Sequence, residues 1–130
     1  MNLQDWIIRH LKQKDLFKKA ILEIVPDPEK KCDLVVKKAN GSQQIFIVPS
    51  LLLPNISNLP VIIVTENKIE NVDVLIKDWQ SFVAHQNLWI YFVDSEKDKY
   101  WVINPFTHER ITEKASLALG LKTMFETANV

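Results

Sequence analysis

The sequence predicts a single α/β (α+β) domain in which a mixed β-sheet is flanked by helices. Apolar residues recur at helical spacing in several segments, and short runs rich in β-branched residues lie between them. The chain has 130 residues, 47% of them hydrophobic, with no internal repeat or low-complexity tract. A chain of this length is ordinarily one domain and buries a core without disulfides. We therefore expect one domain over residues 1–130, in the order helix, three strands, helix, two strands, helix.

The chain begins with an amphipathic helix. Leu3, Ile7, Ile8 and Leu11 recur at helical spacing, and polar residues occupy the other side. Asn2 precedes this pattern and is a residue type that caps helices.

The next segment, residues 15–25, admits two interpretations. Asp15 can cap a second helix with apolar residues at helical spacing, whereas residues 20–25 alone suit a short strand equally well. We favour a helix that ends before Pro26 and Pro28, because proline cannot continue a helix interior.

Three strands are expected next. Residues 32–38 form the first, and an Asn-Gly pair, a strong hairpin signal, joins it to residues 44–48. A connector over residues 49–60 leads to residues 61–65, a continuous apolar run. Such a run is typical of a strand buried on both faces.

The second half contains the most regular helical pattern. Asn71 caps a helix whose apolar face extends to Val83. Strands over residues 88–93 and 100–103 then form a hairpin, which Pro105 ends.

A loop and a final helix complete the chain. The loop over residues 104–110 combines Phe106 with Arg110, residue types that serve as interface anchors or stack on bases. Thr112 is expected to cap the final helix, and Gly120 to interrupt it.

Composition excludes several classes of protein. The 16 basic and 16 acidic residues cancel, which argues against a histone-like binder and an acidic disordered chain. Residues 1–38 nevertheless carry a net charge of +3, which could meet phosphate, although we favour lysines that only solvate the outer faces of a helix and a strand. The two glycines exclude a P-loop and a dinucleotide fingerprint. Cys32, the only cysteine, cannot form an internal disulfide.

The strongest candidate for chemistry follows the buried strand. Glu66 and Lys68 are two positions apart, so they point to the same side if the strand continues. A carboxylate can bind Mg²⁺ while a lysine polarises the attacking water. A complete metal site needs a second carboxylate, which Asp33 could supply.

These residues, with the element order over residues 3–94, resemble the PD-(D/E)XK nuclease superfamily. The resemblance implies a restriction-endonuclease-like core and a Mg²⁺-dependent phosphodiester hydrolase that acts on DNA. Glu66 would be a metal ligand and Lys68 the catalytic lysine. The family's first acid usually lies on the second strand, whereas Asp33 lies on the first. If the strand of Asp33 is instead matched to the family's acid-bearing strand, the first acid is in its usual place. Residues 47–49, which carry no catalytic chemistry, then occupy the E-x-K position.

The sequence therefore favours a small nuclease-like domain with a degenerate catalytic set, which binds or cleaves nucleic acid. Whether the domain is an enzyme stays open. An alternative follows from the element order, which is also similar to that of small bacterial secretion chaperones. In that case the partner would be another protein or a second copy of the chain. No segment approaches the roughly 20 apolar residues that span a bilayer, so we expect no membrane partner and a cytoplasmic location.

Overall fold

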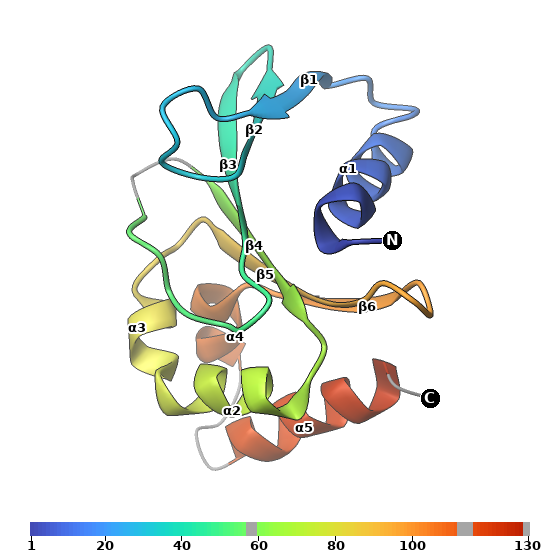
Figure 1. Cartoon of the computed structure of the whole chain (residues 1–130). Coiled ribbons are helices and arrows are strands. Elements are labelled where there is room, and N and C mark those ends of the chain that lie inside the picture. The colour runs from blue at the N-terminus through green and yellow to red at the C-terminus, as the bar shows by residue number, and fades with distance from the viewer. Residues whose placement is uncertain (57–59, 112–115, 129–130) are drawn as a thin grey trace.

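The computed structural model of the protein describes residues 1–56, 60–111 and 116–128, and shows a six-stranded mixed sheet with helices on both faces (Figure 1). The elements are α1 (Leu3–Lys14), β1 (Ile21–Pro26), β2 (Leu34–Lys38), β3 (Gly41–Ile47), β4 (Val61–Glu66), α2 (Ile69–Lys77), α3 (Trp79–Val83), β5 (Leu88–Asp94), β6 (Lys99–Ile103), α4 (Pro105–Ile111) and α5 (Leu117–Ala128). The predicted α+β class, with a mixed sheet flanked by helices, is confirmed.

The strands lie in the sheet in the order in which they occur in the chain, β1 to β6. β3, β4 and β5 run parallel to one another, and the other three neighbouring pairs are antiparallel. A parallel pair needs a crossover connection. The segment over residues 48–60 supplies one between β3 and β4, and α2 with α3 supplies the other.

Each face of the sheet has its own core. On one face, α1 buries Leu3, Trp6 and Ile7 against residues of the central strands, including Ile62 and Val64. On the other face, α2, α3 and α5 pack over the alternate positions of the same strands (Figure 1). Val61–Thr65 are all buried, as predicted for this strand. No helix of the described residues is long and apolar enough to cross a bilayer.

The predicted hairpin is confirmed. Lys38 is paired with Gly41 at the turn between β2 and β3, and Gly41 has φ +137°. This backbone conformation is rarely adopted by residues with a side chain, which explains glycine at this position.

The favoured helix over residues 15–25 is wrong, because Ile21–Pro26 form β1. The Asp15 carboxylate accepts hydrogen bonds from the backbone N–H groups of Ala20 and Ile21 at 2.8 and 2.9 Å, which reverses the chain after α1. β1 then pairs with β2. Sheet pairing thus overrides a local helical pattern in a segment where β-branched residues also suit a strand.

The helix predicted from Asn71 begins two residues earlier, at Ile69, and divides at Asp78 into α2 and α3. The Asn71 side chain does not cap it. It accepts a bond from the N–H of Leu51 and donates to the carbonyl groups of Pro49 and Glu66, at 2.7–2.9 Å. The Asn71 side chain therefore connects the segment before β4 with the end of β4, and it does not cap α2.

The segment predicted as a loop over residues 104–110 contains α4, which begins at Pro105. The Asn104 side chain accepts a bond from the Thr107 N–H at 3.1 Å and so caps α4, and proline is favourable at a first helical position. Gly120 does not interrupt α5. The predicted cap Thr112 lies outside the described residues.

Candidate functional site

Glu66 and Lys68 lie at the carboxyl end of β4, on the same side as predicted. Their side chains form an ion pair, with 2.7 Å between the lysine Nζ and the Glu66 Oε2. The hydrogen bond from Lys68 to Glu66, and then the charge of that carboxylate, raise the pKa of Lys68. Both side chains reach solvent, so the pair is a screened surface interaction.

The backbone at this point is held from both sides. Asn67 is buried, and its Oδ1 accepts a bond of 2.8 Å from the Trp101 indole. The Asn71 amide binds the Glu66 carbonyl oxygen at 2.7 Å. The buried neighbours of Glu66 thus fix the turn from β4 into α2 and leave only the carboxylate and the ammonium outside.

Asp33 is not brought to this pair. It directly precedes β2, and its Oδ2 accepts a bond of 2.6 Å from the N–H of Ile47. β3 lies between β2 and β4, which separates the two strands by roughly 10 Å, twice the ordinary strand spacing. The carboxylate of Asp33, one residue before β2, therefore binds a backbone N–H group of β3.

The donor groups at the end of β4 do not fit Mg²⁺. Glu66 contributes one carboxylate, which already binds an ammonium group. Among the residues that the structure describes, no three His, Cys, Asp or Glu side chains are grouped closely enough to hold a metal ion. Mg²⁺ sites with this chemistry use oxygen ligands from more than one group. We derive no catalytic step through a metal here.

Comparison with known proteins gives no relative. No family model, curated protein or solved structure matches this chain. The site must therefore be interpreted from its own geometry.

An aromatic cluster that was not predicted from the sequence lies on the face of the sheet that α1 covers. Trp6 and His10 of α1 stack with ring centroids 4.8 Å apart, and Tyr100 meets His10 edge to face at 4.6 Å. The Asp98 carboxylate accepts bonds from the Trp6 indole at 2.8 Å and from Arg9 at 2.6 Å. These bonds fasten the β5–β6 turn to α1.

His10 stands at the centre of this cluster. Burial, and then the positive charge of Lys14, lower the pKa of His10. Its Nε2 is buried without a hydrogen-bond partner. The neutral ring therefore serves as a packing surface.

An open groove continues from the cluster beyond the carboxyl-terminal end of α1. It has a volume of about 520 Å³ and lies against the sheet at the amino ends of β4 and β5. Its apolar floor includes Ile62, Trp89 and Tyr91, and Tyr100 stands at one side. Tyr100 remains 43% exposed, so part of its ring is free for a ligand.

The groove carries a positive charge. Lys14, Lys18 and Lys38 line it, and none of the three forms an ion pair with another described residue. The single acidic lining residue is Asp15, whose two carboxylate oxygens already accept backbone N–H groups. We call this site, formed by the three lysines and the aromatic rings of β5 and β6, the basic aromatic groove.

Cys32 and His108, two other residue types that can carry chemistry, make structural contacts instead. Burial raises the pKa of the Cys32 thiol to about 11, and its Sγ donates to the Leu34 carbonyl at 3.2 Å. A protonated thiol is a poor nucleophile. His108 meets the Trp79 ring edge to face, and burial lowers the pKa of His108. Neither residue lines the groove.

Proposed function

We propose that the domain binds nucleic acid through the basic aromatic groove and that it does not hydrolyse phosphodiesters at Glu66 and Lys68. The observation that carries this proposal is the combination of Lys14, Lys18 and Lys38 with an aromatic floor in one concave site. Lysines neutralise backbone phosphates, and aromatic rings stack on unpaired bases.

The shape of the groove supports a single-stranded ligand. Its volume of about 520 Å³ is far smaller than the space that a duplex segment fills. Tyr91 is buried, so Trp89 and Tyr100 are the rings of the groove that a base can reach, and a base can stack on them only when it is unpaired. A single strand also places its phosphates beside its bases, within reach of the lysines at the rim.

The geometry at Glu66 argues against hydrolysis at the predicted residues. The Glu66 carboxylate binds the Lys68 ammonium, and the Asp33 carboxylate binds the Ile47 N–H instead of completing a metal site. The groove begins at the amino ends of β4 and β5, where Ile62 and Trp89 are found, and extends to Tyr100, which the sheet register places level with Glu66 two strands away. A strand held in the groove would therefore meet no group of metal ligands among the described residues.

The proposal is tested by the fluorescence anisotropy of a labelled single-stranded oligonucleotide and of its duplex. We expect tighter binding of the single strand and a loss of affinity with added salt. Replacing Trp89 with leucine keeps an apolar side chain but removes the stacking indole. We expect about tenfold weaker binding, since base stacking contributes roughly 1–3 kcal/mol.

Lys38→Glu should weaken binding and lower its salt dependence, because a phosphate contact is lost. Lys31→Glu is the charge-matched control, since Lys31 is exposed, lies outside the groove and pairs with Glu29. Equal effects of the two lysine variants, or no binding by the unmodified chain, would contradict the proposal.

A further inference from the structure

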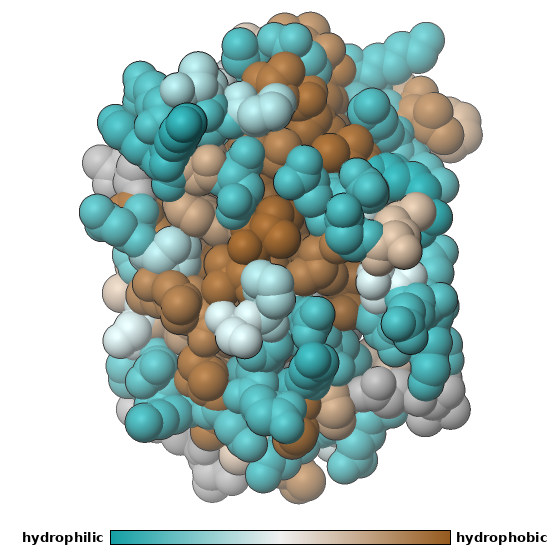
Figure 2. Space-filling view, viewed as in Figure 1, coloured by the Kyte–Doolittle hydropathy of each residue, from teal (hydrophilic) through white to brown (hydrophobic). Residues whose placement is uncertain are grey.

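A second exposed surface lies at the turn between α1 and β1. Leu16 is 65% exposed, Phe17 is 96% exposed and Leu22, on the neighbouring strand, is 69% exposed. Figure 2 shows an apolar projection at the upper right, where Figure 1 places this turn. Large apolar side chains gathered on a projection mark a contact surface more often than scattered single ones do.

The turn is ordered by its own hydrogen bonds. The Asp15 carboxylate binds the N–H groups of Ala20 and Ile21, and the Lys19 N–H donates to the Asp15 carbonyl at 2.8 Å. Lys19 has φ 48°, a left-handed conformation that ordinary residues seldom adopt. The fold thus holds Leu16 and Phe17 away from the core by a defined turn.

The apolar projection is set among positive charges. Lys12, Lys14, Lys18 and Lys19 lie on either side of Leu16 and Phe17 in the sequence, and none forms an ion pair with another described residue. The carboxylate of Asp15, the one acid among them, is occupied by backbone groups. Glu23, beside Leu22, pairs with Lys37, and Asp5 lies at the far end of the flank. The charge next to Leu16 and Phe17 is therefore positive and favours an anionic occupant.

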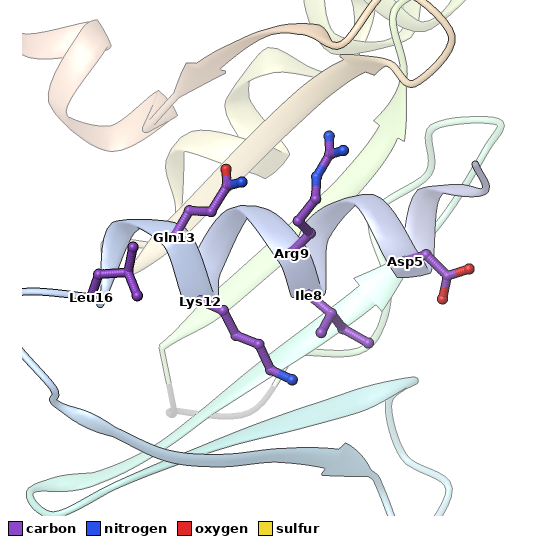
Figure 3. Close-up of a pocket in the computed structure, with 6 residues that line it drawn as sticks. All are labelled: Asp5, Ile8, Arg9, Lys12, Gln13 and Leu16. Atoms are coloured by element: carbon purple, nitrogen blue, oxygen red, sulfur yellow. The ribbon is translucent and has the colours of Figure 1, made fainter.

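The apolar surface continues along the outer flank of α1. A hollow of about 290 Å³ contains Leu16 and Leu22 between Lys12 and Lys19. Lys12 and Leu16 also line a shallow depression of about 360 Å³ that includes Ile8, and Figure 3 shows Ile8 and Lys12 extending from one side of the helix. Ile8, Leu16 and Leu22 thus add apolar surface next to the turn, with Lys12 and Lys19 beside them.

We infer that this turn contacts an anionic lipid surface. Leu16 and Phe17 would enter the boundary between headgroups and acyl chains, while the four lysines contact anionic headgroups. A lipid surface fits better than a protein, because a projecting Phe17 needs a pocket in a protein partner but none in a bilayer. Contact through so few apolar side chains is reversible and sensitive to salt.

This inference shares Lys14 and Lys18 with the groove, but its apolar residues do not belong to the groove. Leu16, Phe17, Leu22, Lys12 and Lys19 lie outside the groove lining. It is also compatible with the absence of a spanning helix among the described residues, because a surface contact requires none. The inference departs from the expectation of no membrane partner, which was based on the lack of a segment long enough to span a bilayer.

The test is co-sedimentation of the full chain with phosphatidylcholine vesicles that contain or lack phosphatidylglycerol. We expect binding to the anionic vesicles alone, and its loss in high salt. Phe17→Ser should weaken this binding about tenfold, because one large side chain no longer leaves water. Leu119→Ser is the matched control, since Leu119 is 72% exposed on α5 and should have no effect.

Equal binding by the Phe17→Ser variant and the unmodified chain, or no binding to anionic vesicles, would overturn the inference. Circular dichroism of the same variants shows whether they fold, and oligonucleotide anisotropy shows whether the groove binds nucleic acid. The two measurements separate a failure of this inference from a failure of the proposed function. Vesicle binding that is lost in Phe17→Ser while oligonucleotide binding is unchanged supports both proposals. Vesicle binding without any oligonucleotide binding supports this one and overturns the other.

Discussion

His10 is held in its neutral form by the groups around it. The rings of Trp6, Tyr91 and Tyr100 contact its ring, and burial and Lys14 lower its pKa below the ordinary value of 6.5. The unfolded chain takes up a proton near pH 6.5, whereas the folded chain does so only at lower pH. The free energy of unfolding contributed by His10 is therefore complete above pH 6.5 and falls as the pH drops toward the folded pKa.

We expect urea unfolding to show lower stability at about pH 5.5 than at about pH 7.5. In His10→Phe, which keeps an aromatic ring at this position, the change with pH should be smaller. It should not vanish, because burial also lowers the pKa of His108. The same change with pH in both proteins would show that His10 does not contribute.

At the scale of elements, Asn71 joins three parts of the fold. Its side chain reaches the connector before β4 at Pro49 and Leu51, and the end of β4 at Glu66, while its backbone belongs to α2. Asn71 is 4% exposed, so water cannot replace these bonds. An alanine there would leave the Leu51 N–H without its partner and remove one of the two bonds that the Pro49 and Glu66 carbonyl groups each accept.

We expect Asn71→Ala to reduce the free energy of unfolding by roughly 3 kcal/mol, measured by urea denaturation. The matched control is Asn55→Ala, an exposed asparagine of the same connector, which should change stability by less than about 0.5 kcal/mol. A loss as small as that of Asn55→Ala would show that the side-chain bonds of Asn71 are not required.

Elements with a strong local pattern were predicted well. The buried strand β4, the hairpin at Gly41 and the amphipathic α1 agree with the sequence analysis because each depends on residues next to one another in the chain. β1 was missed because its stability depends on pairing with β2. α4 was missed because Pro105 was interpreted as an end, whereas proline also suits a first helical position.

At the scale of the whole molecule, the two ends of the parallel strands carry different groups. Glu66 and Lys68 lie at the carboxyl end, and Lys38, Ile62 and Trp89 of the basic aromatic groove lie toward the amino end. We expect no cleavage of single- or double-stranded DNA that requires Mg²⁺ or Mn²⁺ and is lost in Glu66→Ala. Metal-dependent cleavage that disappears in this variant would establish a nuclease and would require a second metal ligand.

The sequence could predict only the local part of the candidate site. Side chains two positions apart in a strand point to the same side, so the spacing of Glu66 and Lys68 predicted that they lie together. It could not show that Asp33 would bind a β3 backbone group, since that contact joins two strands. The groove was also beyond prediction, because its lysines lie between residues 14 and 38 and its rings between residues 89 and 100. The basic excess of residues 1–38 was the available signal.

The order of the strands bears on how the chain folds as it leaves the ribosome. Because every strand lies beside its predecessor, each new strand can add to the growing edge, and none must be inserted between two that have already paired. α1 is different. It is made before every strand of the sheet, but Ile62 and Val64 of β4, against which its apolar face packs, come about 50 residues later. Tyr91 and Asp98, which complete its contacts, follow later still. The apolar face of α1 is therefore uncovered until β4 has been made, and this interval is where aggregation or chaperone binding would act.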